Sequence, residues 1–564
     1  DYFQNILYNH ADGKAIGMTY FRQRGIRDDI VRKFQLGYST TAHDALAQEA
    51  LRKGYKKEFL IKTGLCYEKE DGSLRDRFWG RVIFPWFNIS GKVLGFGGRV
   101  LDSRSATKGV KVKYVNSPES EIFSKRKELY GIFQAKAAIV KADCVYMVEG
   151  YTDVIAMHQC GLENVVANSG TALSEQQIRL LHRFTPNITL LYDGDEAGIK
   201  ASIRGIDMLL AEGMNIKVLL LPDGDDPDSF SRKHNATEFK QYIAEHEENF
   251  IRFKTNLLLK DAQKDPVKRA GLIADMARSI GLIPNDVIRY ACVKECATIL
   301  NVNEQIILNE IKKHLLQRDD NYLEQIKKEK DTTNTLSPSA DMVPPPIGTE
   351  DNVPPPPFPP EELEAQYQSY IPEEGREKYV FYAKEQLLIK TLIRYGERIM
   401  CYVETEENAE TPLTVIEYIS MDLKQDELQF HNPLHRRILA EAESHLHDQN
   451  FTAERYFLAH PDPTISKLAA EMINDRYQLS KYHSKSQKIV TDEERLHELV
   501  PHQIIDFKLA ILEEEMKHTL QALSKPEVTQ DANKCLEIMA HYKELSELLK
   551  EMAKRAGDRV VLKA

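Results

Sequence analysis

The sequence lacks three features that would place it in specialised protein classes. No apolar run approaches the roughly 18 residues that a membrane-spanning helix requires, although 42% of the residues are hydrophobic. The seven cysteines form no CxxC pair and show no paired spacing, which argues against a disulfide framework. No secretory signal opens the chain. We therefore expect a soluble, cytoplasmic protein with no membrane contact.

The sequence also lacks a uniform charge. Its net charge is −11, yet residues 1–130 contain 24 lysines and arginines against 15 acids, a balance of +9 that leaves −20 for the remainder. This asymmetry suggests a front portion that binds a polyanion. A solvated surface of mixed charge would explain a modest excess about as well.

The length of 564 residues predicts about three to five domains. A segment rich in proline and polar residues reads as an extended spacer. Strands alternating with helices before residue 235 predict a parallel sheet, and helical patterning dominates afterwards, ending in two long helices around SKPEVTQ. The expected fold class is multidomain α/β plus all-α. Its parts are a mixed α/β basic subdomain (1–128), a parallel-sheet core (129–235), a helical bundle (236–325), the linker (326–375), a helical domain (376–500) and a helical hairpin (501–564).

Three predicted strands of the core end in acidic residues. These are Glu149 with Asp153 one helical turn later, Asp193 and Asp195 in DGD, and Asp223, Asp225, Asp226 and Asp228 in PDGDDPD. Ligands bind beyond the carboxyl ends of parallel strands, so these carboxylates are expected to meet. Two carboxylates about 5 Å apart repel by roughly 3 kcal/mol at an effective dielectric near 20. Bound Mg²⁺ or Mn²⁺ would offset that repulsion.

Two simpler interpretations stand beside the metal site. An isolated Asp-Gly-Asp is an ordinary turn sequence. Asp228 precedes an amphipathic stretch and would equally serve as a helix cap. The joint occurrence of three acidic clusters makes the turn-only interpretation improbable.

Several sequence blocks resemble the Toprim domain of bacterial DnaG-type DNA primases. The blocks are VEGYTDVIAMHQCG, NSGTALSEQQIRLL, LLYDGDEAGIKA and LPDGDDPDS, preceded by RGIRDDIVRKFQLGYS, RFWGRVIFPWFNISGKVLGFGGRVL and KYVNSPESEIFSKRKELYGI. The resemblance covers residues 15–235 closely and the helices up to about 320 less specifically. The region after the linker is similar only by position and helicity.

The resemblance assigns roles to individual residues. It implies that Glu149, Asp193 and Asp195 are catalytic metal-binding acids and that Asp153, Asp226 and Asp228 are further acids of the same site. It places six residues on the motifs that hold template strand and incoming nucleotide: Arg81, Arg99, Lys113, Tyr114, Asn116 and Lys125. Tyr114 could stack on a base or belong to the core. The glycine-rich GFGG before Arg99 could admit a phosphate or form a hairpin bend.

Two departures from the family pattern stand out. Similar primases begin with a zinc ribbon, whereas this sequence starts at Asp1 and has no CxxC pair. Zinc is therefore not expected in this chain, and whether such a module has been trimmed or is absent stays open. The second departure is Trp79 in RFWGR, at a position where relatives commonly carry arginine.

The leading hypothesis is metal-assisted synthesis of short RNA primers on single-stranded DNA from ribonucleoside triphosphates. Glu149 could act as a metal ligand or as a general acid or base. The alternatives are a Toprim nuclease or topoisomerase, which shares the acidic core, and a non-catalytic replisome adaptor. The resemblance further implies that the region beyond residue 375 docks to a replicative DnaB-type helicase.

Overall fold

The computed structural model divides the chain into two compact units, Asp1–Pro338 and Ser339–Ala564. It describes residues 1–101, 112–169, 173–192, 205–262, 265–316, 381–404, 410–448, 450–473, 492–523 and 532–556. The predicted linker, 326–375, lies outside the described residues. Within those ranges, no helix is long and apolar enough to cross a membrane.

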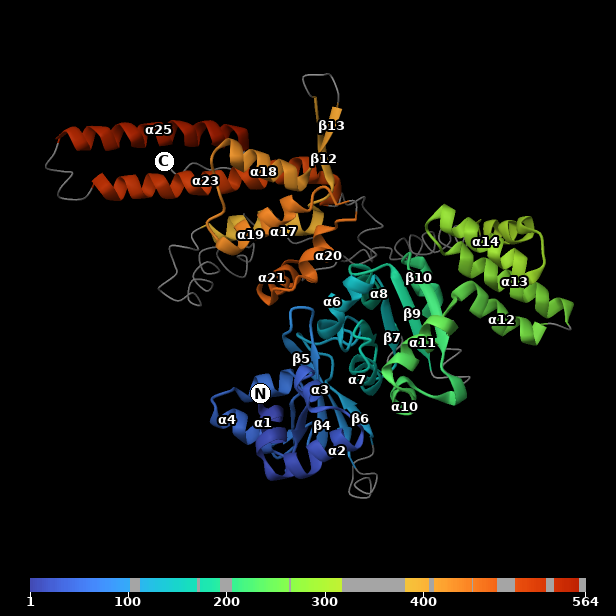
Figure 1. The fold of residues 1–564 in the computed structure, drawn as a ribbon. Helices are drawn as coiled ribbons and strands as arrows, with labels where there is room; N and C mark the ends of the chain where they lie inside the picture. The colour runs from blue at the N-terminus through green and yellow to red at the C-terminus, as the bar shows by residue number, and fades with distance from the viewer. Residues whose placement is uncertain are drawn as a thin grey trace, which may run out of the picture. The chain divides into compact units, whose positions relative to one another are not determined.

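The first part of the first unit is built on a four-stranded antiparallel sheet (Figure 1). Its strand order is β1 (Gly37–Ser39), β4 (Arg81–Phe87), β5 (Val93–Val100), β6 (Tyr114–Asn116). Every residue of β4 is buried, as expected for a strand packed on both faces. Pro85 is tolerated in this central strand because β1 pairs with β4 only as far as Ile83, and a proline cannot donate to a neighbouring strand.

Helices cover this first sheet, and a separate small hairpin accompanies it. The helices are α1 (Tyr2–Asn9), α2 (Thr19–Gln23), α3 (Asp28–Lys33), α4 (Ala45–Arg52) and α5 (Lys57–Lys62), and the hairpin joins β2 (Cys66–Glu68) to β3 (Leu74–Asp76). Aromatic rings fill the space between the sheet and the next subdomain. Phe84 stacks on Tyr151 with ring centroids 5.3 Å apart, and Trp86 meets the same ring edge-on at 6.0 Å. The first and second subdomains therefore share a core.

The second part contains a five-stranded sheet in the order β11, β10, β9, β7, β8. Four strands are parallel, as predicted: β7 (Val145–Val148), β8 (Val165–Ala167), β9 (Asn187–Tyr192) and β10 (Asn215–Leu220). The flanking helices include α6 (Ile132–Ala142), α7 (Tyr151–Gln159), α8 (Glu175–His182), α10 (Pro227–Lys233) and α11 (Ala236–His246). The edge strand β11 (Glu248–Asn249) runs antiparallel to β10. Strands were expected only up to about residue 235, so β11 extends the sheet beyond the predicted limit; two residues carry too little pattern to be recognised.

A helical bundle completes the described part of the first unit. It contains α12 (Phe250–Ala262), α13 (Pro266–Gly281) and α14 (Asp286–Leu300). The buried Lys254 of α12 lies 2.9 Å from Asp275 and donates to the Ser279 hydroxyl at 2.7 Å. Ser279 in turn donates to Asp207 at 2.6 Å. This polar chain ties the bundle to the subdomain that carries the parallel sheet.

The second unit corrects one expectation. Its region was predicted to be helical throughout, but β12 (Ile399–Glu404) and β13 (Glu410–Thr414) form an antiparallel hairpin. The remaining elements are helical: α17 (Tyr382–Tyr395), α18 (Val415–Gln425), α19 (Pro433–Ser444), α20 (Ala453–Leu458) and α21 (Pro463–Ile473), followed by the predicted pair α23 (Leu496–Leu523) and α25 (Ala532–Ala556). The first strand of the hairpin, IMCYVE, is only six residues long, and its apolar residues do not alternate with polar ones. No strand signal therefore stood out from the surrounding helical patterns.

Candidate active site

The carboxyl ends of three parallel strands meet at one edge of the sheet. Met147 in β7 pairs with Leu190 in β9, and Leu220 at the end of β10 pairs with Tyr192 at the end of β9. Glu149 follows β7 directly and is exposed. These registers align the carboxyl ends of the three strands. Asp193 and Asp195, which follow Tyr192 in the sequence, lie outside the described residues.

Asp153 supports the turn that carries Glu149. It lies in the first turn of α7, and its carboxylate accepts a hydrogen bond from the Gly150 backbone nitrogen at 2.9 Å. A Cβ atom at Gly150 would stand 3.0 Å from the same carboxylate oxygen. A side chain at position 150 would therefore crowd the Asp153 carboxylate.

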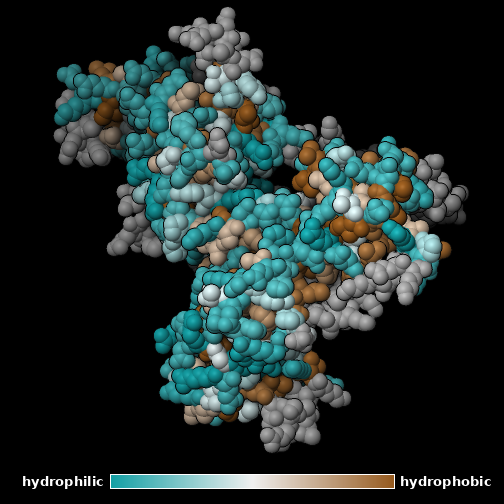
Figure 2. Space-filling view, turned by 45° about the vertical axis from the view of Figure 1, so that its right-hand side comes forward, coloured by the Kyte–Doolittle hydropathy of each residue, from teal (hydrophilic) through white to brown (hydrophobic). Residues whose placement is uncertain are grey.

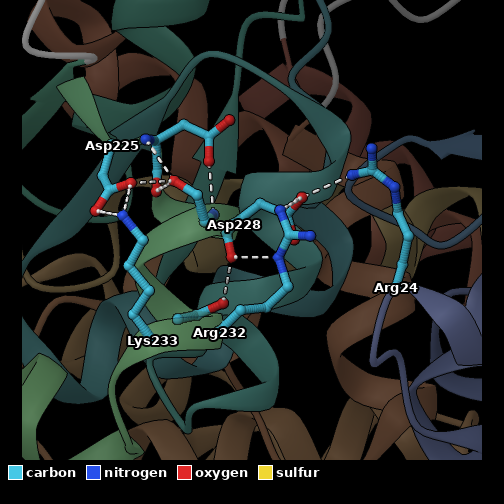
Figure 3. Close-up of polar contacts among 8 residues, drawn as sticks. Arg24, Asp225, Asp228, Arg232 and Lys233 are labelled. Carbon is cyan, nitrogen blue, oxygen red and sulfur yellow. Dashed lines mark hydrogen bonds and ion pairs between the residues drawn. The ribbon is translucent and has the colours of Figure 1, made fainter.

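The third acidic segment is held by basic side chains (Figure 3). Asp228 is only 6% exposed and forms ion pairs with Arg24 at 2.6 Å and with Arg232 at 3.2 Å. Asp225 pairs with Lys233 at 2.7 Å. Burial raises the pKa of Asp228, while Arg232 and Arg24 oppose that shift. An unpaired buried carboxylate would be costly, so these arginines stabilise its charged form.

The helix cap predicted at Asp228 belongs to Asp226. The Asp226 carboxylate accepts a hydrogen bond from the Ser229 backbone nitrogen at 2.6 Å, and Asp226 precedes α10 directly. Asp228 lies inside the first turn instead. Pro227 at the first helical position explains this start, because its fixed φ favours that position. The predicted metal-binding role of Asp226 stays a prediction.

Arg99 lies between two tyrosine rings that face the acidic segment. Its guanidinium carbon is 5.5 Å from the centre of the Tyr20 ring and 5.3 Å from that of Tyr114. The Lys113 ammonium lies 6.0 Å from the Tyr114 ring. Burial raises the pKa of Tyr114, with Arg99 opposing the shift and Asp153 and Asp228 adding to it. Basic and acidic residues that are far apart in the sequence therefore share one electrostatic environment.

Tyr114 and Asn116 differ in their surroundings. Tyr114 is 37% exposed, so it is not a core tyrosine. Asn116 accepts a hydrogen bond from the Tyr151 hydroxyl and so connects β6 to the shared aromatic core. The predicted contacts of both residues with nucleic acid or nucleotide stay predictions.

The glycine-rich run before Arg99 is explained by packing inside the protein. It lies within β5, so the predicted hairpin bend is wrong; the turn between β4 and β5 lies at residues 88–92. A Cβ atom at Gly97 would approach the Tyr151 ring to 2.7 Å, and one at Gly98 would approach the Phe78 ring to 2.9 Å. Glycine is required here because aromatic rings cover both faces of the strand.

Arg81 is buried, unlike the other predicted basic contacts. It is 5% exposed, and its guanidinium donates to the carbonyl oxygens of Gly98, Lys113 and Val112 at 3.2, 3.1 and 2.9 Å. Burial lowers its pKa. In this arrangement Arg81 fastens the segment that carries Lys113 and Tyr114 to the sheet. Its predicted contact with template or nucleotide stays a prediction.

Trp79 occupies the position where arginine is common in relatives. Its ring meets the His43 ring edge-on with centroids 4.2 Å apart, and the Arg75 guanidinium lies 5.6 Å from its centre. Trp79 is half-buried. The position is therefore part of a small aromatic and cationic cluster on the first subdomain.

Lys125 lies in a loop that is pinned to α8. Gln177 is fully buried and its side-chain nitrogen donates to the carbonyl oxygens of Lys125 and Glu128 at 2.9 and 2.8 Å. Ser174 donates to the Arg126 carbonyl. This anchoring holds the backbone beside Lys125 in place, while its predicted contact with nucleotide or template stays a prediction.

The same loop predicts a pH dependence of stability. Burial raises the pKa of Glu128 to about 7. A carboxyl group whose pKa is higher in the folded than in the unfolded protein contributes its full stability below the pKa of the unfolded state. That contribution is lost as the pH rises through the pKa of the folded state. We expect Glu128→Gln to reduce the loss of unfolding free energy between pH 5 and 8 by about 1–2 kcal/mol, measured by urea denaturation. An unchanged pH profile would contradict this assignment; Glu121→Gln, an exposed change in the same loop, is the control.

Arg24 and Tyr20 were not singled out from the sequence. The charge excess of the front portion indicated basic residues in general. It could not indicate that Arg24 would meet an acid 204 positions away, because that pairing depends on how two subdomains pack.

The residues at the strand ends have the ligand chemistry that a divalent cation requires. No group of three potential metal ligands occurs among the described residues, which do not include Asp193 and Asp195. Glu149 and Asp226 carry carboxylate oxygens, the ligand type that hard cations such as Mg²⁺ and Mn²⁺ prefer. The predicted metal-binding roles of Glu149, Asp193 and Asp195 stay predictions.

Family models match three regions of the chain. Residues 2–136 match the N-terminal domain of the DNA primase catalytic core, and residues 146–231 match a Toprim-like domain. Residues 373–560 match a domain of unknown function, DUF8430. The first two matches contain every predicted site residue.

Curated relatives and a solved structure agree with these matches. The DNA primase of Clostridium acetobutylicum is 37% identical over 328 residues, which cover 57% of this chain and 52% of the relative. The DNA primase of Halalkalibacterium halodurans is 40% identical over 254 residues, 45% of this chain and 41% of the relative. A crystal structure of a DNA primase domain from Pseudomonas aeruginosa shares 32% identity with a TM-score of 0.50, covering 55% of this chain and 96% of that domain. The chain thus spans about half the length of the curated relatives it matches.

Proposed function

Because this chain belongs to the DnaG-type primase family, whose catalytic core it carries in its first 231 residues, we propose that it synthesises short RNA primers on single-stranded DNA. The observation that carries the proposal is the alignment of the β7, β9 and β10 ends beside a cluster of arginines and a partly exposed tyrosine. Acids at strand ends suit phosphoryl transfer, and the basic and aromatic groups suit a nucleic-acid strand.

Each side-chain group has a separate task in the proposed reaction. Glu149, Asp193 and Asp195 would hold one or two Mg²⁺ or Mn²⁺ ions, with Asp153, Asp226 and Asp228 as supporting acids. Such ions, when bound, lower the pKa of an attacking hydroxyl and neutralise charge on the departing pyrophosphate. Arg99 and Lys113 would bind phosphates, and Tyr114 would stack on a base.

Two contacts indicate that Asp226 and Asp228 play a secondary part beside Glu149, Asp193 and Asp195. Arg24 neutralises Asp228 at 2.6 Å, and Asp226 is committed to the start of α10. Asp228 therefore acts through its hold on Arg24 and Arg232, which keeps the basic subdomain and the acidic edge in register. The nuclease or topoisomerase alternative shares the acids but has no use for the primase-specific region, residues 2–136.

The direct test is a primer-synthesis assay. Full-length protein incubated with single-stranded DNA, four ribonucleotides and Mg²⁺ or Mn²⁺ should yield short RNA. Supercoiled DNA without ribonucleotides should stay intact. Cleavage or relaxation of that DNA, together with no RNA product, would favour the nuclease or topoisomerase instead.

The region after the linker is proposed to dock to a replicative helicase of the DnaB type. It forms its own compact unit and includes the long antiparallel pair α23 and α25. We expect deletion of residues 376–564 to leave intrinsic primer synthesis within about twofold and to abolish its stimulation by the helicase, because the catalytic residues precede this region. The measurement is primer yield with and without helicase; equal stimulation of both proteins would contradict the docking role.

A further inference from the structure

A cavity lies at the opposite end of the parallel sheet from the acids. Its volume is about 540 Å³, and it is lined by the first residues of β7, β9 and β10 and by residues of α12 and α14. A volume of several hundred cubic ångströms is typical of small-molecule sites. The three strands that begin at this cavity end at the proposed catalytic edge, so a ligand here would not occupy the catalytic site.

The floor of the cavity is apolar. It is formed by Leu210, Met214, Ile216, Phe250 and Ile283, all of which are buried side chains. Figure 2 shows hydrophobic surface over the bundle helices of this unit, and Ile288, at 41% exposure, belongs both to the surface and to the cavity lining. An apolar floor with an open apolar edge favours a flat, largely uncharged ring system.

The rim of the cavity is rich in amides. Asn187, Asn215, Asn249 and Asn285 all line it. The Asn249 and Asn285 carbonyl oxygens accept from the backbone nitrogens of Ile251 and Val287 at 2.8 and 2.9 Å. Their amide nitrogens carry no hydrogen bond within the described ranges and can donate to a ligand. Asparagine amides complement the hydrogen-bonding edges of nucleobases.

The charges of the lining disfavour a phosphate. Among the described residues that line the cavity, Lys217 is the one basic side chain. Its ammonium group is paired with Glu247 at 2.5 Å. Asp143 adds a second carboxylate, which accepts hydrogen bonds from Thr185 and Asn187 at 2.9 and 3.0 Å. The balance is one net negative charge, so a nucleotide's phosphates would be repelled whereas an uncharged nucleoside would not.

We propose that this cavity is a binding site for an uncharged purine nucleoside or a heteroaromatic ring system of that size. The ring would lie on the apolar floor, and the side-chain amides of Asn249 and Asn285 would bind its polar edge. The amide nitrogens of Asn187 and Asn215 donate to Asp143 and to Asn187 instead. The occupant would bridge the sheet and the bundle, which meet at the cavity. This proposal does not depend on the catalytic function.

The test uses full-length protein and adenosine as the probe, with binding followed by isothermal titration calorimetry. We expect saturable binding of adenosine and at least about tenfold weaker binding of AMP, because the lining is acidic. Ile288→Trp should weaken adenosine binding at least about tenfold by filling the cavity edge. Val287→Trp is the matched control: Val287 is the neighbouring residue in α14, is 79% exposed and does not line the cavity.

A catalytic-site variant separates this proposal from the proposed function. Glu149→Gln should leave adenosine binding unchanged although it removes primer synthesis. No adenosine binding, equal binding of AMP, or binding that survives Ile288→Trp would overturn the inference. Loss of binding in Glu149→Gln would place adenosine at the catalytic edge and overturn it as well.

Discussion

Replacement of Glu149 by glutamine should reduce primer synthesis at least about 100-fold while the protein stays folded. Glu149 is exposed, so the loss of its charge should change the free energy of unfolding by less than about 0.5 kcal/mol. The expected defect arises because a neutral amide neither balances a bound divalent cation nor accepts a proton at that position. The rate is measured from labelled RNA made on single-stranded DNA at saturating ribonucleotides.

A second readout connects the same residue to the cation. Mg²⁺ that binds only the folded protein raises its melting temperature, and Glu149→Gln should diminish that increase. Glu163→Gln is a matched control, because Glu163 is a partly exposed carboxylate of the same subdomain that pairs with Lys33 at 3.0 Å. Full activity of Glu149→Gln, or an unchanged response of its melting temperature to Mg²⁺, would remove Glu149 from the proposed site.

The parallel sheet was predictable because its strands alternate with amphipathic helices along the chain. Asn187–Tyr192 and Asn215–Leu220 are two of these strands. The alignment of their carboxyl ends followed from the general geometry of α/β folds. The two-residue strand β11 and the hairpin β12–β13 escaped recognition because short strands carry little periodicity.

The contacts of individual side chains were less predictable from the sequence than the order of helices and strands. Asp226 and Asp228 are two residues apart, and either could precede the helix; only the backbone shows that Asp226 caps it and that Asp228 is paired with Arg24. The glycines of GFGG were interpreted through their local freedom, yet their neighbours are rings from distant segments. Local patterns identify which residues carry charge or flexibility, whereas packing between subdomains decides what each one contacts.

Arg81 offers the clearest test of that distinction. We expect Arg81→Met to lower the free energy of unfolding by about 3 kcal/mol, because three carbonyl oxygens lose a charged donor while the surrounding volume stays filled. Template binding should weaken at least about tenfold, since Lys113 and Tyr114 lie on the segment that Arg81 fastens. Urea denaturation measures the first effect, and the KM for single-stranded DNA measures the second.

Two comparison variants decide between anchoring and direct contact. Arg81→Lys keeps the charge but lacks the planar fork that reaches several carbonyls, so it should restore little stability. Arg99→Met removes a positive charge that faces Tyr20 and Tyr114 and should weaken template binding with little change in the free energy of unfolding. If Arg81 touched the template or nucleotide directly, Arg81→Met would resemble Arg99→Met, and Arg81→Lys would retain much of the activity. A stable, poorly active Arg81→Met protein would therefore contradict the anchoring role, because removal of three buried hydrogen bonds cannot leave stability unchanged.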